Sequence, residues 1–517
     1  MCALSRSAVR RGDRAAGMPG ARRTDARWGA AAAVAALLVF LLVRRSLIDD
    51  AYITLSYARN LAEHLHWGLT PARSANSATS PLNVLVLGAA TFVVRDAVAA
   101  LGMVFVLLTG AQGWGLSRLA RDLRLGAPAV ALGTSALLFS PLTLSIVGME
   151  MTLGVALLVW LTVAAVEGRP VAFGLLAAAL VLTRVDLAVF PLVLLVAVGD
   201  VRRRAGRVLL VAATAAAPWY VVSWVALGAL VPDTLVIKTV ASGGWDDRDY
   251  GNGPLLYLDE YPVATLLTAA PVVVGLLAVL AWFGARAWRQ PRWVGLGVGA
   301  ALGVAGILHA VAYVLLAPPP FHWYYAPPVA ALTLVATLAA GTAGRAGGPP
   351  APAGSPRPAG WRVTAGAAAG ALMVLAYSTA ALRPPLPWDE VPITTNWATA
   401  EEYRTAGEGL AARLDGETVR SPGEVGALAY HCRCDIVDTL SDRGMLPPVI
   451  DERVTEAGPV MQLLLRVNFA NFTPPAPAAP TRALVWVSGQ DARAAPWPVH
   501  SRWRSPGALD LVPVPVS

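Results

Sequence analysis

The sequence predicts a polytopic α-helical membrane protein with a small extracytoplasmic α/β domain at its C-terminal end. Of the 517 residues, 56% are hydrophobic and only 14% are charged, and the mean hydropathy is +0.55. Long Ala/Leu/Val runs recur from Trp28 to about Leu382, and many of them approach the roughly 20 residues that cross a bilayer. Residues 383–517 contain no such run. We therefore expect a basic cytoplasmic tail (1–27), a transmembrane domain (28–382) and a separate C-terminal domain (383–517).

Eleven apolar segments are the expected transmembrane helices. A further run, Pro81 to Val94, is too short to span comfortably, and runs of its length are more often interfacial, so we place it on the outer side. The expected helices cover residues 28–44, 97–117, 127–146, 150–166, 170–183, 186–199, 207–228, 262–284, 293–317, 324–341 and 361–382.

The placement of arginine supports this topology. With the N-terminus inside, the tail and the inner loops hold 21 arginines and five acidic residues, whereas the outer parts hold 20 basic and 28 acidic residues. Inner loops of membrane proteins are enriched in basic residues, and a spanning segment at 81–94 would turn the later arginine clusters outward. Eleven spans also put the C-terminal domain outside, as for a multi-pass protein of a bacterial plasma membrane.

The C-terminal domain has mixed character. A helical pattern around "TAEEYRTAGEGLAARL" is followed by short strand-like segments such as "ALVWVSG" and "LDLVPVPV". Cys2, Cys432 and Cys434 are too few for a disulfide framework. We interpret the last two as incidental thiols rather than as a metal or redox pair.

The outer loop 45–96 joins the first two spans and is expected to be structured. Within it, "ITLSYARNLAEHLHWG" has helical spacing, with apolar Leu55 and Leu61 on one side and polar residues such as Glu63 on another. Such a helix suits the membrane surface. It carries the adjacent carboxylates Asp49 and Asp50 to the lipid–water boundary.

Polar side chains next to apolar helices gather at the same outer face. Burying an ionisable side chain at membrane depth costs free energy, so a group of them indicates a functional site. Each residue taken alone is also explained as a residue at a helix end within reach of water. These residues are Asp49, Asp50, Arg59, Glu150, Arg184, Asp186, Asp233, Lys238 and His322. Tyr324 lies beside His322 in "PPPFHWYY" and is either an interfacial anchor or a platform for a sugar.

The carboxylate pair indicates the chemistry. Two neighbouring carboxylates raise the pKa of one of them, which suits a general base or a metal ligand. Asp50 is the residue that would hold a divalent metal (Mg²⁺, Mn²⁺ or Ca²⁺), but a two-acid pair alone is a weak indication of metal. No cofactor is otherwise expected.

The ordered motifs of the chain resemble a GT-C glycosyltransferase family. "DDAYITLSYARNL", followed by "TSPLN", is similar to the "DDA(F/Y)I…RYARN…TxPLW" signature of that family, whose best-known member is a mycobacterial terminal arabinofuranosyltransferase. The resemblance covers about 400 residues. It continues through "GME", "TRVD", "VPDTLVIKT", "FHWYYAPP" and "GEVGALAYHCRCDIVDTL".

The resemblance implies an enzyme that transfers a sugar, arabinofuranose or a mannose-like one, from a polyprenyl-phosphate donor. The acceptor would be a hydroxyl of a cell-envelope glycan or glycoconjugate on the outer face of the membrane. By analogy with the first acid of other GT-C outer loops, Asp49 would be the base and Asp50 its partner or a metal ligand. Arg59, Arg184, Lys238 and His322 are the candidates to bind the leaving phosphate, and Glu150 and Asp186 those to orient the acceptor or Asp49.

Two other classes of function remain as alternatives. A secondary transporter also has charged residues near its helices, but its sites usually lie at the bilayer midplane on broken helices, whereas these acids gather at the outer boundary. A non-catalytic membrane partner in cell-envelope assembly would retain the fold without the activity. The expected partners are lipid and glycan, and no nucleic acid.

Overall fold

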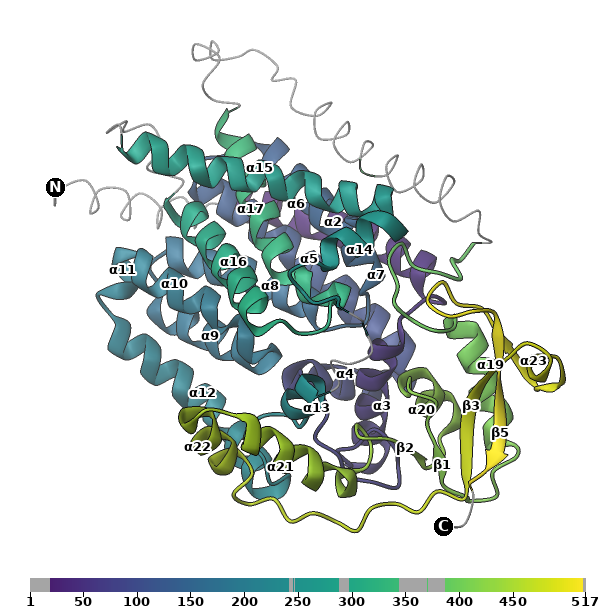
Figure 1. Cartoon of the computed structure of the whole chain (residues 1–517). Coiled ribbons are helices and arrows are strands. Elements are labelled where there is room, and N and C mark those ends of the chain that lie inside the picture. Colours follow the sequence, from purple (N-terminus) through teal and green to yellow (C-terminus); the bar gives the residue numbers. More distant parts are fainter. Residues whose placement is uncertain are drawn as a thin grey trace.

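The computed structural model describes residues 19–240, 245, 247–287, 297–343, 370 and 386–514, and most of them form long helices packed side by side (Figure 1). Among the described residues, six helices are long and apolar enough to cross a membrane, and five shorter apolar helices accompany them. The chain is therefore a multi-pass membrane protein. The helices of the bundle are α2 (Pro19–Val43), α5 (Ala97–Asp122), α6 (Ala127–Leu138), α7 (Pro141–Ser145), α8 (Met151–Val166), α9 (Pro170–Thr183), η1 (Val185–Ala188), α10 (Val189–Ala197), α11 (Gly199–Arg202), α12 (Ala205–Ala226), α15 (Pro262–Ala287), α16 (Gly297–Leu316) and α17 (Ala326–Ala343).

Ten of the eleven expected helices are helical in the structure, and the eleventh, 361–382, lies outside the described residues apart from Gly370. The expected helix 127–146 is wrong in one respect, because it breaks into α6 and α7. Ser140 has an extended ψ of 130° in front of Pro141. A residue that precedes proline avoids the helical conformation, which explains the break.

The first helix starts earlier than expected, within the stretch that the sequence analysis assigned to the tail. The described part of α2 begins at Pro19, and Asp25 in its first half is buried. The hydroxyl of Ser117 donates to Asp25 Oδ1 at 2.7 Å, and the guanidinium of Arg121 pairs with the other oxygen. These contacts with α5 explain why the helix extends beyond the apolar segment.

Small residues bring α2 and α5 into close contact. A Cβ atom added to Gly29 would lie 3.0 Å from the carbonyl oxygen of Gly110, and one on Gly113 would lie 2.6 Å from Cβ of Ala32. Small side chains permit such close approach of helix backbones in membranes. This packing positions the outer end of α2, from which the Asp49–Asp50 pair follows.

Short helices lie at the end of the bundle that the sequence predicts to face outward, which we call its outer side. They are α3 (Asp49–His64), α4 (Pro81–Val94), α13 (Thr234–Val240), α14 (Gly253–Glu260) and the 3₁₀ turn η4 (His322–Tyr325). The helix expected after Asp49 is therefore present. Ten of its 16 residues are buried, including polar Ser56, Arg59 and Asn60. It packs between α4 and the C-terminal segment, so it is not an isolated surface helix.

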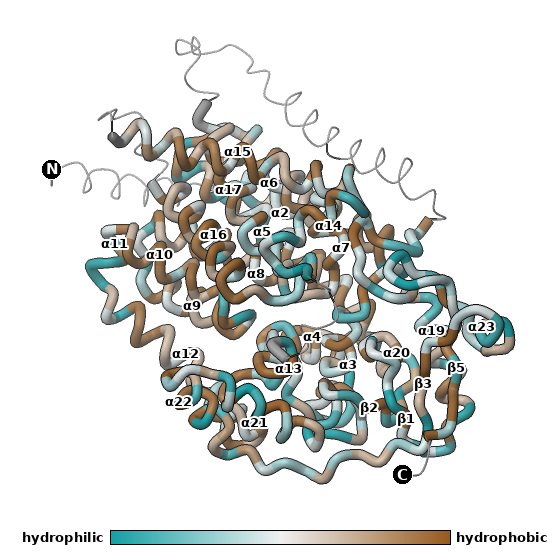
Figure 2. The backbone as a smooth tube through the Cα atoms, viewed as in Figure 1, coloured by the Kyte–Doolittle hydropathy of each residue, from teal (hydrophilic) through white to brown (hydrophobic). Residues whose placement is uncertain are grey.

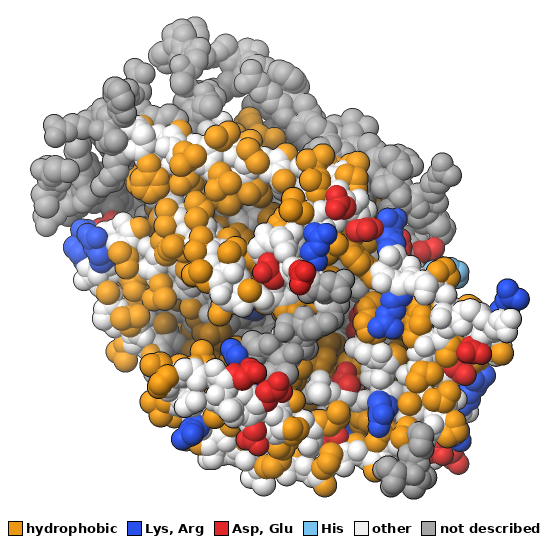
Figure 3. Space-filling view, viewed as in Figure 1, with side chains coloured by type: hydrophobic (Ala, Val, Ile, Leu, Met, Phe, Trp, Pro, Cys, Tyr) orange, Lys and Arg blue, Asp and Glu red, His pale blue; other side chains and the backbone are white. Residues whose placement is uncertain are grey.

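The C-terminal segment combines helices with a mixed sheet of five strands. The strand order is β2–β1–β3–β5–β4, with β1 parallel to β2 and β3, and β5 antiparallel to β3 and β4. Thr399 and Glu402 form a capping box that fixes the start of α19. Figure 3 shows hydrophobic side chains covering the face over α15 and α16, whereas many charged side chains surround the C-terminal elements. These elements are α19 (Ala400–Ala411), β1 (Val419–Arg420), α20 (Gly426–Cys432), β2 (Ile436–Val437), η6 (Arg443–Met445), α21 (Leu446–Glu456), α22 (Pro459–Asn468), β3 (Arg482–Ser488), α23 (Asp491–Ala494), β4 (Trp497–Val499) and β5 (Gly507–Pro513).

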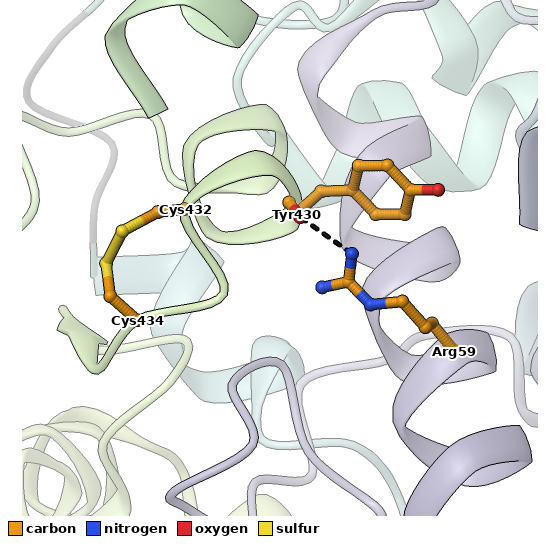
Figure 4. The surroundings of a disulfide bond; sticks show 4 residues. All are labelled: Arg59, Tyr430, Cys432 and Cys434. Carbon is orange, nitrogen blue, oxygen red and sulfur yellow. Dashed lines mark hydrogen bonds between the residues drawn. A yellow bond between two sulfur atoms is a disulfide. The ribbon is translucent and has the colours of Figure 1, made fainter. Parts of the chain in front are cut away.

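The interpretation of the two C-terminal cysteines as free thiols is wrong. Cys432 and Cys434 form a disulfide directly after α20 (Figure 4). Their Cα atoms lie 5.1 Å apart, within the usual range for a disulfide. The C-x-C spacing permits this bond because the chain turns sharply at Arg433, whose φ of 54° is left-handed.

Candidate functional site

Asp49 and Asp50 face different surroundings. They are consecutive residues at the start of α3, and consecutive residues of a helix point about 100° apart. Asp49 Oδ2 accepts a hydrogen bond from the backbone N–H of Gly426 at 3.0 Å, and Oδ1 accepts one from Ala427 at 2.7 Å. Both donors belong to the first residues of α20, where backbone N–H groups have no partner within the helix. Both oxygens of Asp49 are thus engaged in fastening α3 to α20.

The surroundings of Asp49 also change its acidity. Its side chain is buried, and this burial, followed by the neighbouring charge of Asp50, raises the pKa of Asp49 to about 7, while the N–H groups of Ala427 and Gly426 oppose that rise. Such a value alone suits a general base. Both of its oxygens, however, already accept backbone hydrogen bonds from α20.

Asp50 points toward a cation. Its Oδ1 lies 3.8 Å from Nζ of Lys238 on α13, and each of the two side chains is about a quarter exposed. Burial raises the pKa of Asp50, and the carboxylate of Glu150 adds to this effect, whereas Lys238 opposes it. Asp50 therefore has an accessible carboxylate with a heightened affinity for protons.

Arg184, at the end of α9, is the centre of a hydrogen-bond network. Its Nε and Nη2 donate to the two oxygens of Asp186 at 3.0 and 2.9 Å, and its Nη1 donates to Glu150 Oε1 at 2.9 Å. Nη2 also donates to the hydroxyl of Tyr313 at 2.7 Å. The planar guanidinium suits this bidentate geometry, so its orientation is fixed by three partners.

Two residues of this network were missed by the sequence analysis. His309 Nε2 lies 2.9 Å from Asp186 Oδ2, and the Tyr313 hydroxyl donates to the same oxygen at 2.8 Å. Their rings stack with centroids 4.7 Å apart. A histidine and a tyrosine four residues apart on one face of an otherwise apolar helix were the signal that could have revealed them.

Tyr324 connects the two cations. The Lys238 nitrogen lies 5.8 Å from the centre of its ring, and the guanidinium carbon of Arg184 lies 5.5 Å from it. We call the assembled group the outer polar cluster. It consists of Asp50, Glu150, Arg184, Asp186, Lys238, His309, Tyr313 and Tyr324, which lie on α3, η1, α13, α16 and η4, directly before α8 and directly after α9.

Two expected site residues lie instead at the junction with the C-terminal segment. Arg59 Nη1 donates to the carbonyl oxygen of Tyr430 at 2.7 Å, and the guanidinium carbon lies 4.4 Å from the centre of the Tyr430 ring (Figure 4). Asp233 accepts from Nε and Nη2 of Arg443 at 2.8 and 3.0 Å. Like Asp49, these residues join the membrane bundle to the chain after residue 386.

His322 stands apart from the cluster. Its side chain is buried, with the ring of Tyr257 at 6.2 Å and that of Trp323 at 5.0 Å. Within the described part of the chain, neither ring nitrogen has a hydrogen-bond partner. It therefore has no direct contact that would tie it to Asp50 or Arg184.

The described residues around Asp50 do not fit a metal ion. The described residues contain no group of three or more His, Cys, Asp and Glu side chains arranged to hold a metal ion. The nearest charged partner of Asp50 is an ammonium group, which repels a cation.

Among the comparisons with known proteins, the comparison with solved structures finds matches. No family model and no curated protein sequence matches the chain. Its structure is similar to that of ArnT from Cupriavidus metallidurans. The TM-score is 0.56 with 15% sequence identity for the apo state, and 0.52 with 16% identity for the form bound to undecaprenyl phosphate. Both comparisons cover 92% of this chain and 96% of the ArnT chain. It is also similar to the arabinofuranosyltransferase AftD from Mycobacteria, with a TM-score of 0.51 and 15% identity, over 95% of this chain and 40% of that one. Identities this low show a shared fold.

Proposed function

Because the chain has the GT-C fold expected from its motifs, we propose that it is a membrane glycosyltransferase with a polyprenyl-phosphate sugar as donor. The sugar, arabinofuranose or a mannose-like one, would pass to a hydroxyl of a cell-envelope glycan or glycoconjugate on the outer face. The observation that carries this proposal is the juxtaposition of the carboxylate of Asp50 with two cations, Lys238 and Arg184. That one similar structure, ArnT, binds undecaprenyl phosphate supports the class of donor.

Asp50 is the better candidate for the general base. The sequence analysis assigned this role to Asp49, but both oxygens of Asp49 accept backbone hydrogen bonds from α20. A base must reach the proton that it takes, so geometry decides before pKa. In the proposed step, the acceptor hydroxyl loses its proton to Asp50 while its oxygen bonds to the anomeric carbon, and the bond from that carbon to the phosphate oxygen breaks with its electron pair.

Lys238 and Arg184 are proposed to stabilise the departing polyprenyl phosphate. Preorganised positive charge is most effective where negative charge develops in the transition state. Glu150, Asp186 and Tyr313 hold the guanidinium in place before the donor arrives. The Lys238 nitrogen lies over the rings of Phe321, Trp323 and Tyr324, so it keeps favourable cation–π contacts when its partner changes from Asp50 to the phosphate.

The test is sugar transfer in membranes that contain the full chain. A panel of radiolabelled polyprenyl-phosphate sugars is offered, and product formation is compared among the wild type, Asp50→Asn and Lys238→Gln. We expect Asp50→Asn to lower the transfer rate by about 10²–10⁴-fold, the range of general-base catalysis. Lys238→Gln is expected to lower both the rate and the affinity for the donor.

Asp49→Asn is the matched comparison, because it makes the same change one residue away. We expect it to reduce the amount of folded protein more than the rate per folded molecule. Unreduced transfer in Asp50→Asn together with loss in Asp49→Asn at normal folding would return the base to Asp49. Uptake of a solute that follows expression, with no transfer for any donor, would favour a transporter and reject the proposal.

A further inference from the structure

Helix α22 exposes an apolar face to its surroundings. Between residues 386 and 514, the structure describes seven exposed large hydrophobic side chains, and five of them belong to this ten-residue helix. Four are spaced as i, i+3, i+4 and i+7, which places them on one face. The five are Val460, Met461, Leu463, Leu464 and Val467, and Figure 2 shows this helix beside the more polar α21.

The helix is held in place by contacts on its other side. Leu465 and Asn468 are buried, and Asn468 Oδ1 accepts from the backbone N–H of Val231 at 2.9 Å. The indole of Trp224, near the end of α12, donates to the carbonyl oxygen of Val467 at 3.2 Å. Figure 1 shows α22 beside the outer end of α12. The apolar face is thus presented at a fixed position.

That position continues a surface that faces lipid. Helix α12 is long and apolar enough to span, and only 17% of its most apolar window is buried within the protein. Val221, Val222 and Val225 near its outer end are all exposed. In a membrane protein these exposed side chains contact the acyl chains of the lipids. Helix α22 lies beside the end of this lipid-facing surface of α12.

We propose that α22 is an interfacial helix that inserts its apolar face into the outer leaflet of the bilayer and anchors the C-terminal segment to the lipid surface. An amphipathic helix of this kind lies parallel to the membrane surface, and its apolar side inserts to the boundary between the lipid headgroups and the acyl chains. Arg466 is exposed on the same helix, where a guanidinium can reach lipid phosphates. Continuity with α12 selects lipid as the occupant over a second copy of the chain or another protein.

The experiment measures the depth of spin labels in the full chain, reconstituted in nanodiscs of phosphatidylethanolamine and phosphatidylglycerol. Single cysteines replace Leu464 or Leu463 on the apolar face, with Glu456→Cys on exposed α21 as the aqueous control, all in a Cys2→Ser background. Cys432 and Cys434 are disulfide-bonded and do not react with a thiol-directed label. Collisions with oxygen, which concentrates in lipid, are compared with collisions with a water-soluble nickel complex.

We expect labels at 463 and 464 to show a several-fold higher ratio of oxygen to nickel collisions than the label at 456. Equal ratios at all three positions would overturn the proposal. Dipolar broadening between labels at 464 would also overturn it, because it would identify a second copy of the chain on this face. Both substituted leucines are exposed, so folding does not depend on them.

Discussion

At the scale of single residues, the polar groups of the outer face other than His322 separate into two sets. Asp49, Arg59 and Asp233 bind the C-terminal segment, whereas Asp50, Lys238 and the Arg184 network bind one another. All of them share one expected depth in the membrane, so the sequence predicts a single group. The two sets do not separate in the sequence because the partners of Asp49 lie 377 and 378 residues further along the chain.

The buried carboxyl of Asp49 predicts a pH dependence of stability. Its pKa is about 7 in the folded chain and 3.8 in the reference state, so folding favours the protonated form. By linkage, its stabilising contribution is fully present below about pH 4 and is lost as the pH rises toward 7, a change of at most about 4 kcal/mol. We expect thermal unfolding of the wild type in detergent to show this loss, and Asp49→Asn, which does not titrate, to lack it.

A control distinguishes this effect from general titration of the surface. Asp491 is an exposed carboxylate in the same C-terminal segment, so Asp491→Asn is expected to keep the wild-type pH profile. If the wild type and Asp49→Asn lose stability in parallel between about pH 4 and about pH 7, the raised pKa is not the cause.

At the scale of elements, the contact between α3 and α20 depends on a glycine. A Cβ atom added to Gly426 would lie 2.0 Å from the carbonyl oxygen of Asp49, a distance that forces the two helices apart. We therefore expect Gly426→Ala to weaken the docking of the C-terminal segment by about 1–3 kcal/mol, the usual cost of overpacking. Limited proteolysis after residue 386 and the thermal unfolding temperature measure this effect.

Gly458 provides the matched substitution. It lies in the same segment, its φ is −68°, and a Cβ atom there would meet nothing within 4 Å. Gly458→Ala is expected to leave proteolysis and unfolding close to the wild type. Equal behaviour of the two variants would mean that the contact between α3 and α20 does not hold the segment in place.

The elements themselves were predictable where local signals decide them. Apolar length located the helices of the bundle, and "ITLSYARNLAEHLHWG" had the spacing of the helix that includes most of α3. The break before Pro141 also has a local cause, although the sequence analysis did not use it. The burial of α3 was not predictable, because it results from packing against α20, whose residues are about 370 positions away.

At the scale of the whole molecule, the described chain stops at one end of the bundle, after α17, and resumes at the other end, at residue 386. Helix α17 begins beside Lys238 and the outer polar cluster and ends at Ala343 on the opposite side. From residue 386 the chain lies again at the outer end, where the backbone N–H of Trp388 donates to the carbonyl oxygen of Leu42 at 2.8 Å. The expected helix 361–382 lies between these points, outside the described residues apart from Gly370.

The placement of the arginines predicts the orientation of this assembly in the membrane, and this gives the last prediction. Inner loops collect basic residues, and Arg202, Arg203 and Arg204 lie between α10 and α12, at the end away from the outer polar cluster. We therefore expect Arg203→Cys to react with a membrane-impermeant thiol reagent only after cells are permeabilised. Asp491→Cys in the C-terminal segment should react in intact cells, with both variants made in a Cys2→Ser background. The reverse pattern would place the outer polar cluster on the cytoplasmic face and would exclude transfer to a cell-envelope acceptor there.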